Sequence, residues 1–300
     1  MAIKDVLVCL DASEAGEYRL RLAAGLAREH GAHLAAAYLL PELGTMPGQV
    51  NGPGAIAIGI GVIGPAVAGI GTGGGVSSNP DRMPDLSQSV LRAEAVERRF
   101  RQSLQPDGTA GDWHLFDRGG AAQLIALART ADLVVIGQHR PGAPAGAEFH
   151  PEEIVIACGR PLLVVPYAGS FSSVGKRVLI AWDGTREATR AVHDALPLIA
   201  AAQAVTVASV AGGESGLERH HASLDRIVRH LERHGLAVHT EEHLQAGLPV
   251  CDLLLSRASD LGADLIVAGA YHHSRFREAV LGGVSRELLD HMTVPVLMSH

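Results

Sequence analysis

Short apolar runs alternate along this chain with longer stretches in which apolar residues recur at helical spacing. The runs VLVCLD and VLIAWD each end in an aspartate, Asp11 and Asp183, and the runs ADLVVIG and ADLIVAG each end in a glycine, Gly137 and Gly269. Continuous apolar strands joined by helices are typical of βαβ units, which form a parallel sheet covered on both faces. Ligands of such sheets lie at the carboxyl ends of the strands, where all four of these residues fall.

The pattern occurs twice. Asp11 aligns with Asp183 at an offset of 172, and Asp132 aligns with Asp264 at an offset of 132. The segments GRPLLVVP and TVPVLMSH, close to the end of each copy, also correspond. We therefore predict an α/β fold of two tandem Rossmann-like domains, each a five-stranded parallel sheet with flanking helices. The predicted domains span residues 1–168 and 174–300.

The offset falls by 40 because the first copy carries an insertion, which we place at residues 43–80. This segment is uncharged and repeats glycine with small apolar residues. Its glycines and Pro65 interrupt every apolar stretch well short of the roughly 20 residues of a membrane-spanning helix. Two interpretations stay open: a loop that forms no core of its own, or a lid or partner-contacting flap over the strand ends of the first copy.

Composition and charge narrow the range of partners and compartments. The chain has 300 residues, of which 47% are hydrophobic and 19% charged, and its formal net charge is −7. This balance favours a globular protein and disfavours nucleic-acid binding. Cys9, Cys158 and Cys251 are odd in number and lie in apolar surroundings, which predicts buried free thiols in a reducing compartment. The first residues lack the pattern of a signal peptide, so we expect a cytoplasmic protein with no membrane partner.

The glycine-spaced loop after ADLIVAG, followed by a helix and the strand VPVL, completes a pattern similar to the universal stress protein family in its tandem form. The resemblance covers nearly the whole chain outside the insertion and implies an adenine nucleotide alpha hydrolase-like fold in each copy. Nucleotide-binding members carry G-x2-G-x9-G-[ST] in this loop. The second copy keeps Gly269 and Gly282, but has His272 at the second glycine and Gly283 at the Ser/Thr position. Ser285, two residues further on, still offers a hydroxyl.

Physical chemistry supports a phosphate site in this loop. Glycines let backbone N–H groups converge, and Gly282, Gly283 and Ser285 lead into the helix SRELLDHM, whose N-terminus attracts anions. His272 has three open interpretations: a donor to phosphate, a steric plug, or a surface side chain that the loop tolerates. We predict that ATP or another adenine nucleotide binds here, with no metal required by the protein itself.

The other end of the predicted site rests on the resemblance, which places Asp183 against the adenosine and Val210 against the adenine. A carboxylate at a strand end can accept from a ribose hydroxyl or an adenine amine. Asp183 could equally be the N-cap of the following helix, and Val210 could simply be core. The equivalent positions in the first copy are Asp11 and approximately Leu39.

The loop of the first copy does not match. It keeps Gly137 but has no later glycine-glycine-x-serine entry into a helix, and it carries Pro141, Pro144 and Pro151. We predict a degenerate N-terminal site, with the first copy serving as scaffold or interaction surface.

The resulting prediction is a stress-response protein that binds an adenine nucleotide in its C-terminal domain, as an intrachain pseudo-dimer; the association of two chains into a homodimer stays open. The alternative is a nucleotide-free module that acts through protein partners. A slow ATPase is a third possibility, disfavoured because no general base or metal-binding carboxylate pair is found near Gly269. Adjacent histidines at 220–221 and 272–273 lack the ligand spacing of a zinc site.

Overall fold

A computed structural model of the chain describes residues 2–40, 86–116, 120–140, 149–211, 214–244, 249–270 and 283–300. The predicted insertion at 43–80, together with His272 and Gly282, lies outside these residues.

Apart from one short 3-10 helix in the first part, the two parts of the chain contain the same series of strands and helices. The first part contains β1 (Asp5–Leu10), α1 (Glu14–His30), β2 (His33–Leu39), α2 (Leu86–Leu104), the short 3-10 helix η1 (Gln105–Asp107), β3 (Gly111–Phe116), α3 (Gly120–Ala128), β4 (Leu133–Gly137), α4 (Pro151–Cys158) and β5 (Leu162–Val165). The second contains β6 (Arg177–Ala181), α5 (Arg186–Ile199), β7 (Ala204–Ala211), α6 (Glu214–Arg233), β8 (Val238–Leu244), α7 (Val250–Asp260), β9 (Leu265–Gly269), α8 (Gly283–His291) and β10 (Val296–Ser299).

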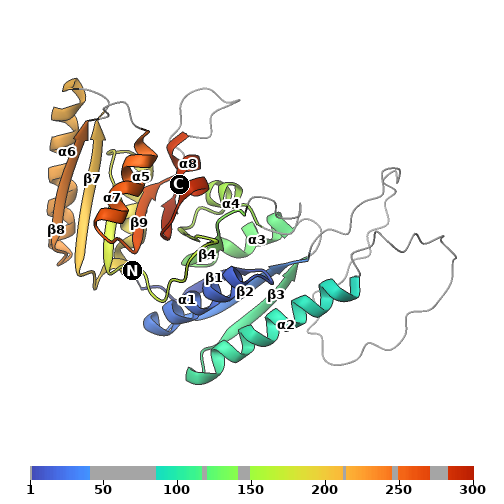
Figure 1. The fold of residues 1–300 in the computed structure, drawn as a ribbon. Coiled ribbons are helices and arrows are strands. Elements are labelled where there is room, and N and C mark those ends of the chain that lie inside the picture. The colour runs from blue at the N-terminus through green and yellow to red at the C-terminus, as the bar shows by residue number, and fades with distance from the viewer. Residues whose placement is uncertain are drawn as a thin grey trace, which may run out of the picture.

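The ten strands of the described residues form one sheet in the order β3-β2-β1-β4-β5-β10-β9-β6-β7-β8 (Figure 1). Neighbours are parallel within each half, and only the central pair, β5 with β10, is antiparallel, with Val164 opposite Val296. The α/β fold class is therefore confirmed. Instead of two separate five-stranded sheets, however, the halves share one sheet, because the last strand of each half pairs with that of the other.

Two hydrophobic clusters cover the two faces of the sheet. One contains Leu22 of α1, Phe100 of α2, Val192 of α5 and Leu231 of α6. The other contains buried side chains of α3, α4, α7 and α8, which are Leu124, Ile154, Leu254 and Leu288. Because both faces are covered, the central strands β4, β5, β9 and β10 are buried almost throughout, which explains their continuous apolar sequences.

The repeat is visible in a pair of equivalent aspartates that precede β4 and β9. Asp132 accepts hydrogen bonds from the backbone N–H groups of Lys4 (2.8 Å) and Asp5 (3.1 Å). Asp264 accepts from the corresponding segment of the second half, at Gly175 (3.1 Å) and its two successors. Each aspartate thus fixes the start of the first strand of its own half, as expected for residues aligned in the repeat.

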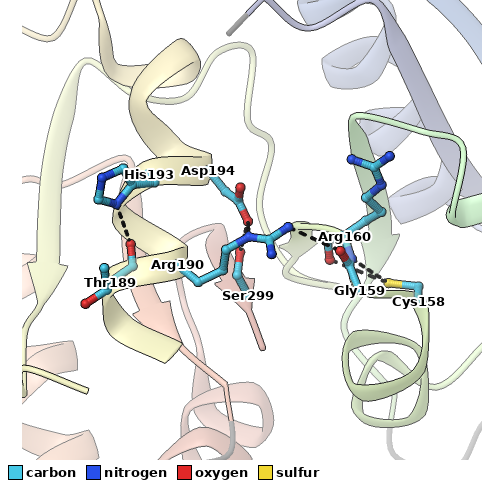
Figure 2. A network of polar contacts seen from close by, with 8 residues as sticks. All are labelled: Cys158, Gly159, Arg160, Thr189, Arg190, His193, Asp194 and Ser299. Carbon is cyan, nitrogen blue, oxygen red and sulfur yellow. Dashed lines mark hydrogen bonds and ion pairs between the residues drawn. The ribbon is translucent and has the colours of Figure 1, made fainter. Parts of the chain in front are cut away.

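Polar contacts join the halves beside the central strand pair (Figure 2). Arg190 of α5 donates from Nη2 to the carbonyl oxygen of Gly159, the C-cap of α4, at 3.3 Å. Its Nε donates to Asp194 at 2.7 Å, and Asp194 also accepts from the Ser299 hydroxyl of β10 at 2.9 Å. The second half therefore holds the end of a first-half helix.

The structure also describes the state of the cysteines, the length and apolarity of the helices, and the grouping of side chains that could hold a metal. Cys9, Cys158 and Cys251 are buried and free, as predicted, and burial raises the pKa of the Cys9 thiol to about 12, which makes it unreactive. In the described part of the chain, no helix is both long and apolar enough to cross a membrane. The same residues contain no group of three or more His, Cys, Asp or Glu side chains that could hold a metal ion.

Candidate functional site

A cavity of about 290 Å³ lies in the second half, at the carboxyl ends of β6, β7 and β9. The order of strands reverses between β6 and β9, and this switch point is where open α/β sheets bind ligands. The described residues that line the cavity are Ala181, Trp182, Asp183, Thr185, Glu187, Ala188, Ala208, Val210, Val250, Leu254, Ala268, Gly269, Gly283, Val284, Ser285 and Leu288. Five of the seven site residues predicted from the sequence are thus brought together, and the other two, His272 and Gly282, lie outside the described residues.

One wall of the cavity is apolar. It is formed by Ala181 of β6, Ala208 and Val210 of β7, and Val250 and Leu254 of α7. Val210 is half-buried, so its side chain is available to a ligand while it remains part of the strand. A wall of this kind suits a flat apolar group, because burial of its faces removes apolar surface from water.

Asp183 is exposed beside this wall, and a local turn fixes its orientation. Its Oδ1 accepts from the Thr185 backbone N–H (2.9 Å) and hydroxyl (2.6 Å), while Oδ2 has no partner among the described residues. Asp183 is not the N-cap of α5: Thr185 takes that position and accepts from the Ala188 N–H at 3.2 Å. The N-cap interpretation of Asp183 was therefore wrong, because the intervening Gly184, with φ of 73°, lets the chain turn before the helix begins.

Gly269, the last residue of β9, forms the floor of the cavity. A Cβ at this position would lie 2.5 Å from the backbone nitrogen of Ala188 and 2.7 Å from the carbonyl carbon of Glu187. The first turn of α5 thus packs directly on the end of β9, and this close approach requires glycine whether or not a ligand binds.

The N-terminus of α8 forms the opposite side. The helix begins at Gly283, two residues before the position expected from the sequence, and no acidic residue lies in its first turn. Ser285 is buried, with 9% of its surface exposed, and its hydroxyl donates to the Gly269 carbonyl at 3.5 Å. The first N–H groups of a helix have no intrahelical acceptor, so this end of the cavity offers donors and a positive partial charge.

Eleven of the sixteen lining residues were not predicted as site residues, and the two among them that bear most on the chemistry are Thr185 and Glu187. Glu187 is only 3% exposed, and its carboxylate accepts from Arg186 Nε at 3.2 Å. Thr185 could have been found as a capping residue before a helical stretch. Glu187 gave no such signal, because a glutamate in a first helical turn is most often solvated.

The equivalent place in the first half is filled by Arg19 of α1. Its Nη2 donates to Asp11 Oδ2 at 2.6 Å, and its Nε donates to the Cys9 carbonyl at 2.6 Å. The guanidinium also lies against Gly137, where a Cβ would overlap Nη1. The space that remains is about 30 Å³, roughly one water molecule. The repeat partner of Arg19 is Ala191, which has no charged group to pair with Asp183.

Electrostatics also separate the two halves. Burial alone would raise the pKa of Asp11, but the Arg19 guanidinium and hydrogen bonds from Ser13 hold it below its ordinary value of 3.8. The carboxylate is thus committed to an internal ion pair. At the N-terminus of α4, Pro151 lacks an N–H, and Glu152 and Glu153 put negative charge in the first turn. This end of the first half is unsuited to an anion.

Comparisons with known proteins bear on the family of the second half and on the fold of the chain. Residues 175–300 match the family model of the Universal stress protein family. Over nearly the whole chain the fold is similar to a universal stress protein from Archaeoglobus fulgidus DSM 4304, with a TM-score of 0.66, 16% identity, and 98% of this chain and 97% of that chain covered.

A functionally unknown protein from Pseudomonas aeruginosa PAO1 is also similar, with a TM-score of 0.60, 16% identity, and 99% and 92% of the two chains covered. The search among curated proteins found no match. Residues 175–300 therefore form a domain of the universal stress protein family, in a chain that shares its fold over nearly its full length with a solved universal stress protein.

Proposed function

We propose that this protein is a stress-response protein that binds an adenine nucleotide in the cavity of its second half, with ATP as the first candidate. The observation that carries the proposal is the contrast between the halves. Equivalent positions of one repeated fold enclose about 290 Å³ in the second half and about 30 Å³ in the first.

The apolar wall suits the adenine. The base would lie against Ala208, Val210 and Leu254, and the free oxygen of Asp183 would accept a hydrogen bond from a ribose hydroxyl or the adenine amine. Because both donors from Thr185 reach Oδ1, the carboxylate is held in place before the ligand arrives. Pre-organisation of this kind reduces the entropy lost on binding.

The phosphates would lie at the N-terminus of α8, over Gly283 and Ser285. The buried carboxylate of Glu187 lies on the α5 side of the cavity and would repel them, so we place them along α8 rather than α5. A helix terminus contributes roughly 0.3 to 1 kcal/mol per charge interaction. A few such contacts together with burial of the base would give a modest affinity, about micromolar.

The first half would not bind. Its strand-end aspartate is paired with Arg19, its cavity is filled, and two glutamates lie at the N-terminus of α4. In this proposal the first half, residues 1–168, is a supporting domain and the second half, residues 174–300, is the binding domain.

The test is isothermal titration calorimetry of ATP into the full chain and two variants. Gly283→Leu adds bulk at the cavity, and a Cβ there meets no atom within 4 Å, so the fold should tolerate it. Gly25→Leu in α1 is the matched control, since its Cβ also meets open space and lies far from the cavity. We expect binding to wild type and Gly25→Leu, and at least a tenfold loss in Gly283→Leu. Equal affinity in all three would place the site elsewhere.

The alternative, a nucleotide-free interaction module, is favoured by one observation, the buried Glu187 carboxylate among the cavity residues. A negative charge there disfavours an anionic ligand. In this case the wild-type chain would take up neither ATP nor adenosine, and calorimetry would return no heat above dilution.

A further inference from the structure

Gln138 follows directly after β4, in the first half, and its side chain reaches across to the second half. It is buried, with 6% of its surface exposed. Its Nε2 donates to the carbonyl oxygens of Leu289 (2.8 Å) and Asp290 (3.1 Å), both in the last turn of α8. Its Oε1 accepts from the Tyr167 backbone N–H at 3.3 Å, just beyond β5. One amide thus ties the ends of two first-half strands to a second-half helix.

The Gln138 amide binds the C-terminal end of α8, where backbone carbonyl groups lack donors within the helix. The last carbonyl groups of a helix have no intrahelical donor, and two of these groups in α8 receive the Gln138 amide. The helix has only nine residues, a length at which a helix in isolation is unstable. A neutral donor at the negative end of the helix also complements its dipole. The position of α8 therefore depends in part on a side chain of the other half.

The tie runs in one direction. The repeat partner of Gln138 is Ala270, whose side chain has no amide group that could form the equivalent hydrogen bond to the first half. The second half instead reaches α4 through Arg190, which donates to the Gly159 carbonyl (Figure 2). The two halves thus support each other through different residues: the Arg190 bond anchors α5, whose first turn lines the cavity, and the Gln138 bonds anchor α8, which lines its opposite side.

We propose that Gln138 is a positioning residue for the nucleotide site, through which the first half sets the place of α8. The inference rests on the proposed function and adds a role for the half whose own site is filled. Gly283, Ser285 and Leu288 of α8 all line the cavity. Because a short helix moves as a rigid rod, a shift of its C-terminus is passed to the N-terminal donors at the other end.

This role predicts a selective loss. The donors at the α8 N-terminus serve the phosphates, whereas the base and ribose contact β6, β7 and α7. Loss of the Gln138 amide should therefore weaken ATP by about tenfold, while adenosine should change by less than about twofold. A general loosening of the fold would weaken both ligands alike.

The experiment compares wild type, Gln138→Leu and Arg190→Ala by calorimetry with ATP and with adenosine. Arg190→Ala is the matched control, because it removes another side-chain hydrogen bond between the halves, one that starts from α5, without touching α8. We expect the selective loss of ATP affinity in Gln138→Leu alone. Equal ATP affinity in Gln138→Leu and wild type, or an equal loss of both ligands, would overturn the inference. If Gln138→Leu does not fold, Gln138→Asn, which keeps the amide and shortens its reach, replaces it.

A second readout needs no nucleotide. Hydrogen–deuterium exchange should be faster in the peptide that covers α8 in Gln138→Leu, and unchanged there in Arg190→Ala. If wild type binds no nucleotide but this exchange pattern is found, the proposed function fails and the positioning of α8 by Gln138 stands. Unchanged exchange over α8 in Gln138→Leu would contradict the positioning role directly.

Discussion

Replacement of Arg19 by leucine tests whether an internal ion pair closes the first-half site. The side chain of Arg19 is 5% exposed and that of Asp11 is 24% exposed, and Nη2 and Oδ2 are 2.6 Å apart. Leucine removes the guanidinium and leaves an apolar side chain in the same buried place. The Asp11 carboxylate then keeps its burial without its partner.

The expected loss of stability follows from these contacts. Breaking a buried ion pair by removing one partner costs about 3 to 5 kcal/mol, and the partial exposure of Asp11 reduces our expectation to about 2 to 3 kcal/mol. The Cys9 carbonyl also loses the donor Nε, at about 1 kcal/mol. We therefore expect the free energy of unfolding to fall by about 3 to 4 kcal/mol at pH 7.

Urea denaturation of wild type, Arg19→Leu, and the double variant Arg19→Leu/Asp11→Asn measures this loss. Asparagine keeps the oxygen that accepts from the Ser13 backbone N–H at 2.7 Å but carries no charge. The double variant should recover about 2 kcal/mol relative to Arg19→Leu, because the unpaired charge is gone. A double variant no more stable than Arg19→Leu would refute the role of the ion pair.

The pH dependence of the stability difference between wild type and Arg19→Leu tests the same ion pair. In wild type the pKa of Asp11 is lowered on folding, so the pair contributes stability above pH 3.8 that is lost as the pH falls through the folded pKa. In Arg19→Leu the guanidinium no longer lowers the pKa of Asp11 and burial is opposed only by the hydrogen bonds from Ser13, so this pKa lies above its value in wild type. The stability difference between the two proteins should therefore narrow from pH 7 toward about pH 4, where the unpaired carboxyl takes up a proton. A constant difference over this range would contradict the assignment.

Three further changes test the packing of the second half. Gly269→Ala should lower the free energy of unfolding by about 1 to 3 kcal/mol, because its Cβ would lie 2.5 Å from the Ala188 nitrogen. Gly283→Ala has open space around its Cβ and should leave the free energy of unfolding unchanged. Equal urea midpoints for these two variants would be inconsistent with this packing. Asp264→Ala removes the acceptor for the start of β6 and should lower the free energy of unfolding by about 1 to 3 kcal/mol. A melting temperature equal to that of wild type would contradict this. Thr185→Ala should cost about 1 kcal/mol through the lost cap and Thr185→Ser much less; equal losses would exclude the cap.

The buried part of the fold could be predicted from the sequence. The runs that became β1, β4, β6 and β9 are continuous and apolar because both faces of a parallel sheet are covered. The repeat offsets also aligned Asp132 with Asp264, and the structure gives them the same task at the start of a strand.

The edges of the sheet were harder to predict. β8 lies at one edge, and none of its described side chains is buried, so its sequence VHTEEHL lacks the apolar run that marks a strand. The antiparallel pairing of β5 with β10 was also missed. LLVV and VLMS are both apolar, and no feature of either sequence predicts that it pairs with the last strand of the other half.

The candidate site was only partly predictable for the same kind of reason. Asp183, Val210 and Gly269 follow strand ends, so the topology brings them together once the strands are recognised. Arg19 and Glu187 lie on helices at positions that read as solvent-facing, and both are buried because of what packs above them. Tertiary packing, which the local pattern does not encode, decides which cavity is open.

The measurement that tests the account most directly is the stoichiometry of ATP binding to the full chain by equilibrium dialysis. One open cavity and one filled by Arg19 predict saturation at one ATP per chain, with that binding lost in Gly283→Leu. Two ATP per chain would show that the first half binds as well. No ATP bound, or one ATP that Gly283→Leu retains in full, would contradict the assignment of the site to the second half.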